Sequence, residues 1–140
     1  STVYSNPAGN GTPESFSSNF WGTGDYYQFS LNSTGYSDIK ISWDQMGSGT
    51  GPASFELQYS IDGNTFTTFD AYTLPNITSW SAGAANEGSS FSYDLSSITD
   101  LNNSATLVFR LVMVGTTSVN GGTTATTGTG RVDNIKVEGR

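Results

Sequence analysis

The amino-acid sequence predicts an all-β fold, a two-sheet antiparallel β-sandwich of about nine strands. Residues that favour strands (aromatic residues, valine, isoleucine and threonine) are plentiful, whereas the helix formers alanine, leucine, lysine and glutamate are scarce. No window repeats apolar residues with the helical period over three turns, while apolar and polar residues alternate in many short segments. A closed barrel would also remove sheet edges, and the sequence separates the two architectures only weakly.

The clearest strand pattern lies between residues 38 and 67. Residues 39–43 and 55–61 alternate apolar and polar side chains, which is the period of a strand with one buried face. The glycine-rich segment 47–52 between them is expected to be a loop. Asp62-Gly63 then predicts a tight hairpin, because glycine accepts the positive φ that such turns require. The stretch should therefore supply three antiparallel strands that a second apolar layer covers.

The remaining segments complete one domain that spans residues 1–140, which is a usual domain length. Further strands are expected at residues 15–20, 26–31, 91–95, 106–114 and 131–138. The 106–114 segment is the most continuously apolar and predicts a central strand with both faces covered. Residues 71–88 are expected to form a long surface connection, and the threonine- and glycine-rich residues 116–130 a mobile loop.

The composition excludes several function classes. The chain has no cysteine and no histidine, so disulfides, thiolate metal sites and imidazole acid–base chemistry are all absent. A net charge of −7 with five basic residues argues against nucleic acid as a partner. No apolar run approaches the roughly 20 residues that would span a bilayer, so membrane insertion is not expected. Few charges and much serine, threonine, asparagine and glycine are typical of an exported protein, secreted or at the cell surface.

Two short motifs carry a resemblance to a known group of proteins. The sequences YSIDGNTF at 59–66 and RVDNIKVEG at 131–139 resemble jelly-roll β-sandwich modules of secreted bacterial proteins, and the looser pattern extends over residues 21–139. Many such modules bind carbohydrate and are attached to polysaccharide-degrading enzymes, which implies a larger multidomain parent protein. The resemblance also implies a structural calcium ion held by Asp133 near the N-terminal segment. Glu14 is our own candidate for a second ligand, chosen from its place in the early polar loop.

Aromatic side chains near predicted loops are the first candidates for a ligand site. A pyranose ring stacks its C–H groups on a flat exposed tryptophan or tyrosine, while neighbouring polar groups bind its hydroxyls. The candidates for this platform are Trp21, Tyr26, Tyr72 and Trp80. Trp43 is excluded because its position in the alternation places it in the core. The alternative is that each of these rings closes an end of the sandwich.

Polar residues on the predicted strands are the second set of candidates. Asp44, Glu56, Gln58 and Arg110 would line a polar groove if neighbouring strands aligned them. Such a groove could bind glycan hydroxyls, or anionic sugars through Arg110. The alternative is a simple cross-strand ion pair between Arg110 and Glu56 on the solvent face.

Taken together, these observations predict a non-catalytic, monomeric module that binds polysaccharide. The alternative is a structural or adhesive module of a cell-surface protein without a small ligand. A third hypothesis is a glycan-cleaving enzyme, because two carboxylates suffice for glycoside hydrolysis. Nothing in the sequence, however, selects one pair among the 12 acidic residues.

Overall fold

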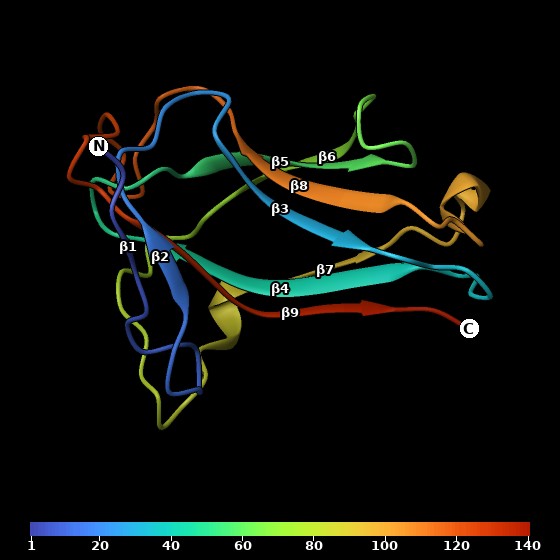
Figure 1. Ribbon diagram of the computed structural model, residues 1–140. Coiled ribbons are helices and arrows are strands. Elements are labelled where there is room, and N and C mark those ends of the chain that lie inside the picture. The colour runs from blue at the N-terminus through green and yellow to red at the C-terminus, as the bar shows by residue number, and fades with distance from the viewer.

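The structure, a computed structural model, describes residues 1–140 as two antiparallel sheets packed face to face (Figure 1). The larger sheet contains, in spatial order, β1 (Tyr4–Ser5), β2 (Phe16–Ser18), β9 (Gly130–Glu138), β4 (Lys40–Gly47) and β7 (Ser90–Asp94). The smaller sheet contains β3 (Tyr26–Leu31), β8 (Leu107–Met113), β5 (Ser54–Ser60) and β6 (Thr67–Thr73). The predicted β-sandwich of nine strands is confirmed.

The order of the strands is that of a jelly roll. The row β2-β9-β4-β7 faces the row β3-β8-β5-β6, so the chain passes from one sheet to the other at most of its connections. The predicted hairpin is confirmed, because β5 pairs with β6 around Gly63, whose φ is 79°. The expectation of one layer of three consecutive strands is wrong, since β4 lies in the other sheet. Alternation predicts which face of a strand is buried but carries no information about which sheet the strand joins.

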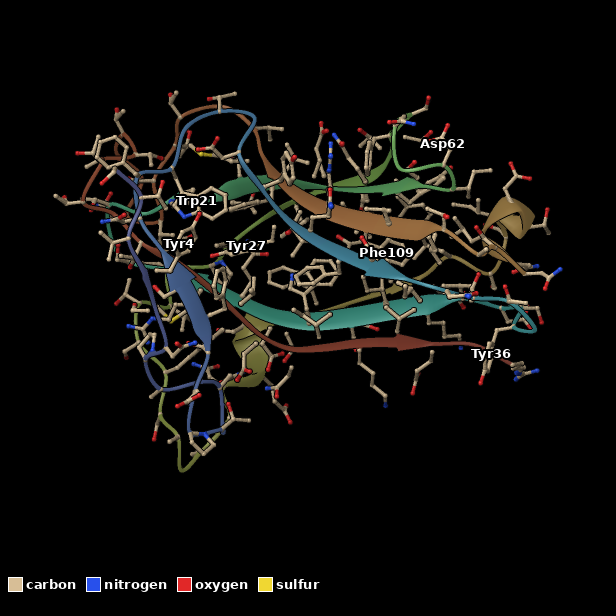
Figure 2. The ribbon with its side chains drawn as sticks, in the orientation of Figure 1. Tyr4, Trp21, Tyr27, Tyr36, Asp62 and Phe109 are labelled. Atoms are coloured by element: carbon tan, nitrogen blue, oxygen red, sulfur yellow. The ribbon has the colours of Figure 1, made fainter.

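The core forms where the inward faces of the two sheets meet. Trp43 and Ile41 from the larger sheet are buried there with Phe55, Leu57 and Phe109 from the smaller one. Figure 2 labels Phe109 between the two sheets. Burying one such side chain contributes about 1.5–3 kcal/mol, so this contact is the main source of stability. β8 is central in its sheet, as predicted, but its outer face is not fully covered: Arg110 and Val112 are partly exposed because no further layer packs there.

The connections hold more order than the sequence predicts. Residues 116–130 are not a free loop, because a bridge joins Ser118 to Pro52 and both Ser118 and Val119 are buried. The connection after β6 begins only at residue 74 and includes the short 3-10 helix η1 (Glu87–Ser89), while η2 (Thr99–Leu101) precedes β8. Neither helix could cross a membrane.

Candidate functional site

A cavity of about 350 Å³ opens at one edge of the sandwich, where β1 and β2 of the larger sheet lie beside β3 of the smaller sheet. We call it the edge cavity. Aromatic side chains from these strands and from the loop between β2 and β3 line it: Tyr4, Phe16, Phe20, Trp21, Tyr26 and Tyr27. Figure 2 labels three of them, Tyr4, Trp21 and Tyr27, close together at the end of the molecule that carries β1 and β2.

The inner wall of the edge cavity is a packed stack of rings. Trp21 and Tyr27 are buried with their ring centroids 4.9 Å apart, and the Trp21 Nε1–H donates to the carbonyl of Ser18 at 3.1 Å. Phe16 meets Tyr27 edge-on at 6.0 Å, and Tyr4 stacks on Phe16 at 5.5 Å. Burial raises the pKa of the Tyr27 hydroxyl well above its ordinary value, against a smaller opposing effect of its hydrogen bond with Ser18. The rings therefore hold one another in fixed orientations.

The rim of the edge cavity leaves aromatic surface in contact with water. Tyr4 is 64% exposed, Phe20 47% and Tyr26 46%, and Phe16 is exposed as well. Only eight large hydrophobic side chains of the chain are exposed, and these four line the same cavity. Exposed apolar side chains scattered singly need no explanation, but their concentration around one cavity makes this surface the candidate site.

Phe20 occupies its place on the rim with an unfavourable backbone. Its φ is 64°, in the left-handed region that bulky side chains rarely adopt. A hydrogen bond from its N–H to the carbonyl of Thr126, 3.0 Å long, fixes the chain there. Such strain persists only where the surrounding structure enforces it, and it gathers at ligand sites.

The side chain of Arg110 packs against the ring of Tyr26. The guanidinium carbon lies 4.0 Å from the centroid of the Tyr26 ring and 3.7 Å from that of Phe66. The Arg110 Nε–H donates to Gln28 Oε1 at 2.8 Å, which fixes the plane of the guanidinium. One cation–π contact, with a guanidinium that Phe66 and Gln28 also hold in place, thus restricts the rotamers of Tyr26 before any ligand arrives.

The structure brings four predicted site residues together on the outer face of the smaller sheet. Tyr26 and Glu56 flank Val112 across neighbouring strands, and Gln58 lies directly beside Arg110. The alternative ion pair between Arg110 and Glu56 does not form, because Arg110 is enclosed by the two rings. Glu56 Oε2 instead accepts hydrogen bonds from Gln58 at 3.2 Å and from the hydroxyl of Thr68 at 3.0 Å.

Three of the four predicted platform rings are buried, so the expectation that they are exposed is wrong for them. Trp21 forms the inner wall of the edge cavity. Tyr72 lies in β6, not in a surface connection, and its side chain turns inward opposite Phe55, where its hydroxyl donates to Gln45 Oε1 at 2.7 Å. Trp80 is buried, and its Nε1–H donates to the Ser89 hydroxyl at 3.0 Å.

Asp44 lies apart from the other predicted groove residues, because β4 belongs to the larger sheet. Its carboxylate is buried and fully occupied by hydrogen bonds. Oδ2 accepts from Asn10 Nδ2 at 3.0 Å and from Asn134 Nδ2 at 2.8 Å, and Oδ1 accepts from the Ser90 hydroxyl at 2.7 Å. Asp44 therefore fastens the N-terminal segment to the sheet and contributes nothing to the outer face of the smaller sheet.

Asp133 lies against the N-terminal segment, where calcium was expected. Thr12 Oγ1 lies 2.5 Å from Asp133 Oδ2 and 3.0 Å from the carbonyl oxygen of Glu14. A Cβ on Gly9 would collide with all three of these oxygens, so they converge on space that only a glycine leaves open. No group of three acidic side chains gathers anywhere, and Glu14 offers its carbonyl here. A carboxylate and neutral oxygens are the kinds of ligand that calcium accepts, and these three oxygens are fewer than the six to eight that it takes.

No family model matches the chain, and no curated protein matches it in sequence. Function is therefore inferred from the geometry of the edge cavity. Sequence reasoning missed most of the edge cavity, whose further lining residues include Tyr4, Phe16, Phe20, Asp25 and Tyr27. The alternation in residues 26–31 carried a signal for Tyr27, but nothing in the sequence indicates that β1 and β2 extend the larger sheet past the edge of the smaller one.

Proposed function

We propose that the protein is a non-catalytic module that binds polysaccharide in the edge cavity. The observation that carries the proposal is the gathering of six aromatic side chains around one cavity, four of them exposed. Exposed ring faces stack on the C–H groups of pyranoses, and Asn19 and Asp25 at the same cavity offer polar atoms for the hydroxyls.

Because the rings are already held in place, a shallow surface can bind a sugar at a low cost in side-chain ordering. Association costs free energy for every side chain that must be ordered, and a preformed site avoids much of that cost. Tyr26 is restrained by Arg110, and Tyr4 is restrained by its stacking on Phe16. The volume of about 350 Å³ lies at the lower end of the range of ligand pockets, which suits one or two sugar rings of a longer chain.

The charges around the edge cavity favour binding over hydrolysis. Asp25 is the only carboxylate that lines it. Most glycosidases use two carboxylates that flank the scissile bond, one as acid and one as nucleophile or base.

The polar, weakly charged composition supports export. We therefore propose that the module acts at the cell surface or outside the cell, as a monomeric part of a larger protein.

Affinity electrophoresis through gels that contain soluble polysaccharides tests the proposal. We expect retardation by at least one polymer, weakened about three- to tenfold by Tyr4→Ala and by Tyr26→Ala, because each removes one stacking ring. Tyr36→Ala is the matched control, since Tyr36 is also exposed, at 54%, but lies at the opposite end of the sandwich (Figure 2).

Two outcomes would contradict the proposal. The absence of retardation across neutral, sulfated and uronic polymers favours the structural or adhesive module. Release of reducing ends from any of these polymers favours an enzyme.

We also propose a structural calcium ion at Asp133, with Thr12 and the carbonyl of Glu14 as further ligands. A bound ion would fasten the N-terminal segment to β9. The melting temperature is then expected to be higher with calcium than with a chelator, and Asp133→Asn should remove the difference. Equal melting temperatures of the wild-type protein under the two conditions would exclude the metal.

A further inference from the structure

We propose that the saccharide held in the edge cavity carries a cationic amine, as in a polymer of glucosamine. This inference rests on the proposed function and names its ligand class. It follows from the charges and rings that surround the cavity.

The edge cavity offers negative charge and no positive side chain. Asp25 is its only charged lining residue, and no lysine or arginine lines it. The Arg110 guanidinium lies against the ring of Tyr26, a lining residue, but it also contacts the ring of Phe66 and is bonded to Gln28. The whole chain adds a net charge of −7. Its field therefore attracts cationic ligands and repels sulfated or uronic sugars.

The Asp25 carboxylate is held in place with one oxygen left over. Oδ2 accepts a hydrogen bond from the Gly22 N–H at 2.8 Å. The main chain of Asp25 is fixed as well, because its N–H donates to Gly22 at 3.0 Å and its carbonyl accepts from Met113 at 2.8 Å. Oδ1 accepts no hydrogen bond from the protein. It is therefore free to accept a charge-assisted hydrogen bond from an ammonium group.

The rings complete a site for a cation. The face of an aromatic ring is the negative end of its quadrupole and attracts a cation within about 6 Å of the centroid. Tyr4 and Phe20 expose their rings at the same cavity as Asp25, whereas the ring of Tyr26 already carries the Arg110 guanidinium. A protonated amino sugar can place its C–H face on one ring and its ammonium group between the carboxylate and another ring. An N-acetylated sugar can use the rings and donate neutral hydrogen bonds to the carboxylate, but it cannot form the stronger charge-assisted one.

Calorimetric titration of the intact chain with three defined oligosaccharides tests the inference: glucosamine hexamer, its fully N-acetylated form, and a galacturonic acid hexamer. We expect the glucosamine hexamer to bind roughly tenfold more tightly than the acetylated one, and the uronic hexamer to bind most weakly. Asp25→Asn should weaken binding of the glucosamine hexamer more than binding of the acetylated hexamer, and so abolish the preference for the amine. The asparagine Oδ1 can still accept from Gly22, so the loop is preserved. Asp100→Asn, at an exposed carboxylate in η2, is the matched control and should change nothing.

The outcomes separate this inference from the proposed function. Equal affinity for the glucosamine and acetylated hexamers, or an Asp25→Asn variant that keeps the preference, overturns the cationic ligand. If Tyr4→Ala still weakens binding in that case, the glycan module stands. If no hexamer binds, the cationic ligand is overturned, and retardation in the polysaccharide gels decides whether the proposed function stands.

Discussion

Phe20 combines a strained backbone with an exposed ring, which is a poor arrangement for stability taken alone. A left-handed conformation costs a bulky residue about 1–2 kcal/mol, and about half of the ring gains nothing from burial. The arrangement does place a ring at the rim of the edge cavity. At the scale of single residues, a substitution of Phe20 should therefore weaken binding without lowering stability.

Phe20→Asn tests that separation. Asparagine tolerates the left-handed region, so the relief of strain should offset the lost ring contacts, and the free energy of unfolding should stay within about 1 kcal/mol of the wild-type value. Glycan retardation should fall in the same variant, while Phe20→Tyr, which keeps a ring, should bind normally. Urea denaturation and affinity electrophoresis measure the two effects. A variant that binds like the wild-type protein would remove Phe20 from the site.

Residue-level prediction from sequence succeeded where the alternation of a strand was recognised, and it failed for Tyr72 in the unrecognised part of β6 and for residues in loops. The burial of Trp43 follows from its place in a strict alternation, and the structure confirms it. Trp21 lies in a loop, where no period assigns a direction, and it turns inward to Tyr27. Tyr26 and Tyr27 show the difference within one strand: the first is exposed and the second is buried, as period two requires.

At the scale of elements, the turn between β5 and β6 depends on one carboxylate. Asp62 Oδ1 accepts hydrogen bonds from the N–H groups of Asn64 and Thr65, each at 2.8 Å, and from the Ser60 hydroxyl at 2.8 Å. The bonds from Thr65, then Asn64 and then Ser60 lower the pKa of Asp62 from 3.8 to about 2. The folded form thus favours the ionised carboxylate.

The sign of this shift predicts an acid response of the turn. A depressed pKa in the folded state contributes stability above the unfolded value of 3.8, and the contribution is lost as the pH falls towards 2. The amide proton shifts of Asn64 and Thr65 should titrate together with a midpoint near 2, and Asp62→Asn should make them independent of pH. A midpoint near the unfolded value of 3.8 would mean that the carboxylate does not hold the turn.

Elements were predictable because each carries its own local signal, whereas their assembly was not. The bounds of β3 agree with the predicted strand, and the β5–β6 hairpin follows from Asp62-Gly63. The assignment of β4 to the larger sheet depends on contacts with β7 and β9, which lie far along the chain. The edge cavity depends on the same long-range pairing, since β2 reaches it only by joining β9.

At the scale of the whole molecule, the N-terminal segment is closed onto the larger sheet by amides and carboxylates instead of disulfides. Asn10 Oδ1 accepts from the Asn86 N–H at 2.6 Å, its Nδ2 donates to Asp44, and its backbone N–H donates to Asp133 Oδ2 at 2.9 Å. One buried residue thus links β4, β9 and the segment before η1 through its side chain and its backbone N–H. This closure keeps β1 and β2, and with them one wall of the edge cavity, in register with the sandwich.

The amino-acid composition of the chain predicts how the stability of the whole molecule varies with pH. With no histidine, no side chain has an ordinary pKa between about 5 and 8, so the free energy of unfolding should be nearly constant from about pH 5 to 9. Above that range the buried phenols matter, because burial raises the pKa of Tyr27 and of Tyr72 well above the ordinary value of 10.0.

A raised pKa in the folded state means that each phenol contributes stability that is complete below about pH 10 and is lost as the pH rises further, because only the unfolded chain then releases the proton. The loss should reach about 1.4 kcal/mol per pH unit for each buried phenol.

Tyr27→Phe and Tyr72→Phe should each make the alkaline decline shallower in urea unfolding measured at successive pH values. Tyr72→Phe should also lower the neutral value by about 1 kcal/mol, because the hydrogen bond to Gln45 is lost. Tyr36→Phe, at an exposed position, is the control and should leave the profile unchanged. If stability declines as steeply in the double variant Tyr27→Phe/Tyr72→Phe as in the wild-type protein, these phenols are not held out of water. Tyr27 would then not be buried, which would contradict the packed inner wall of the edge cavity.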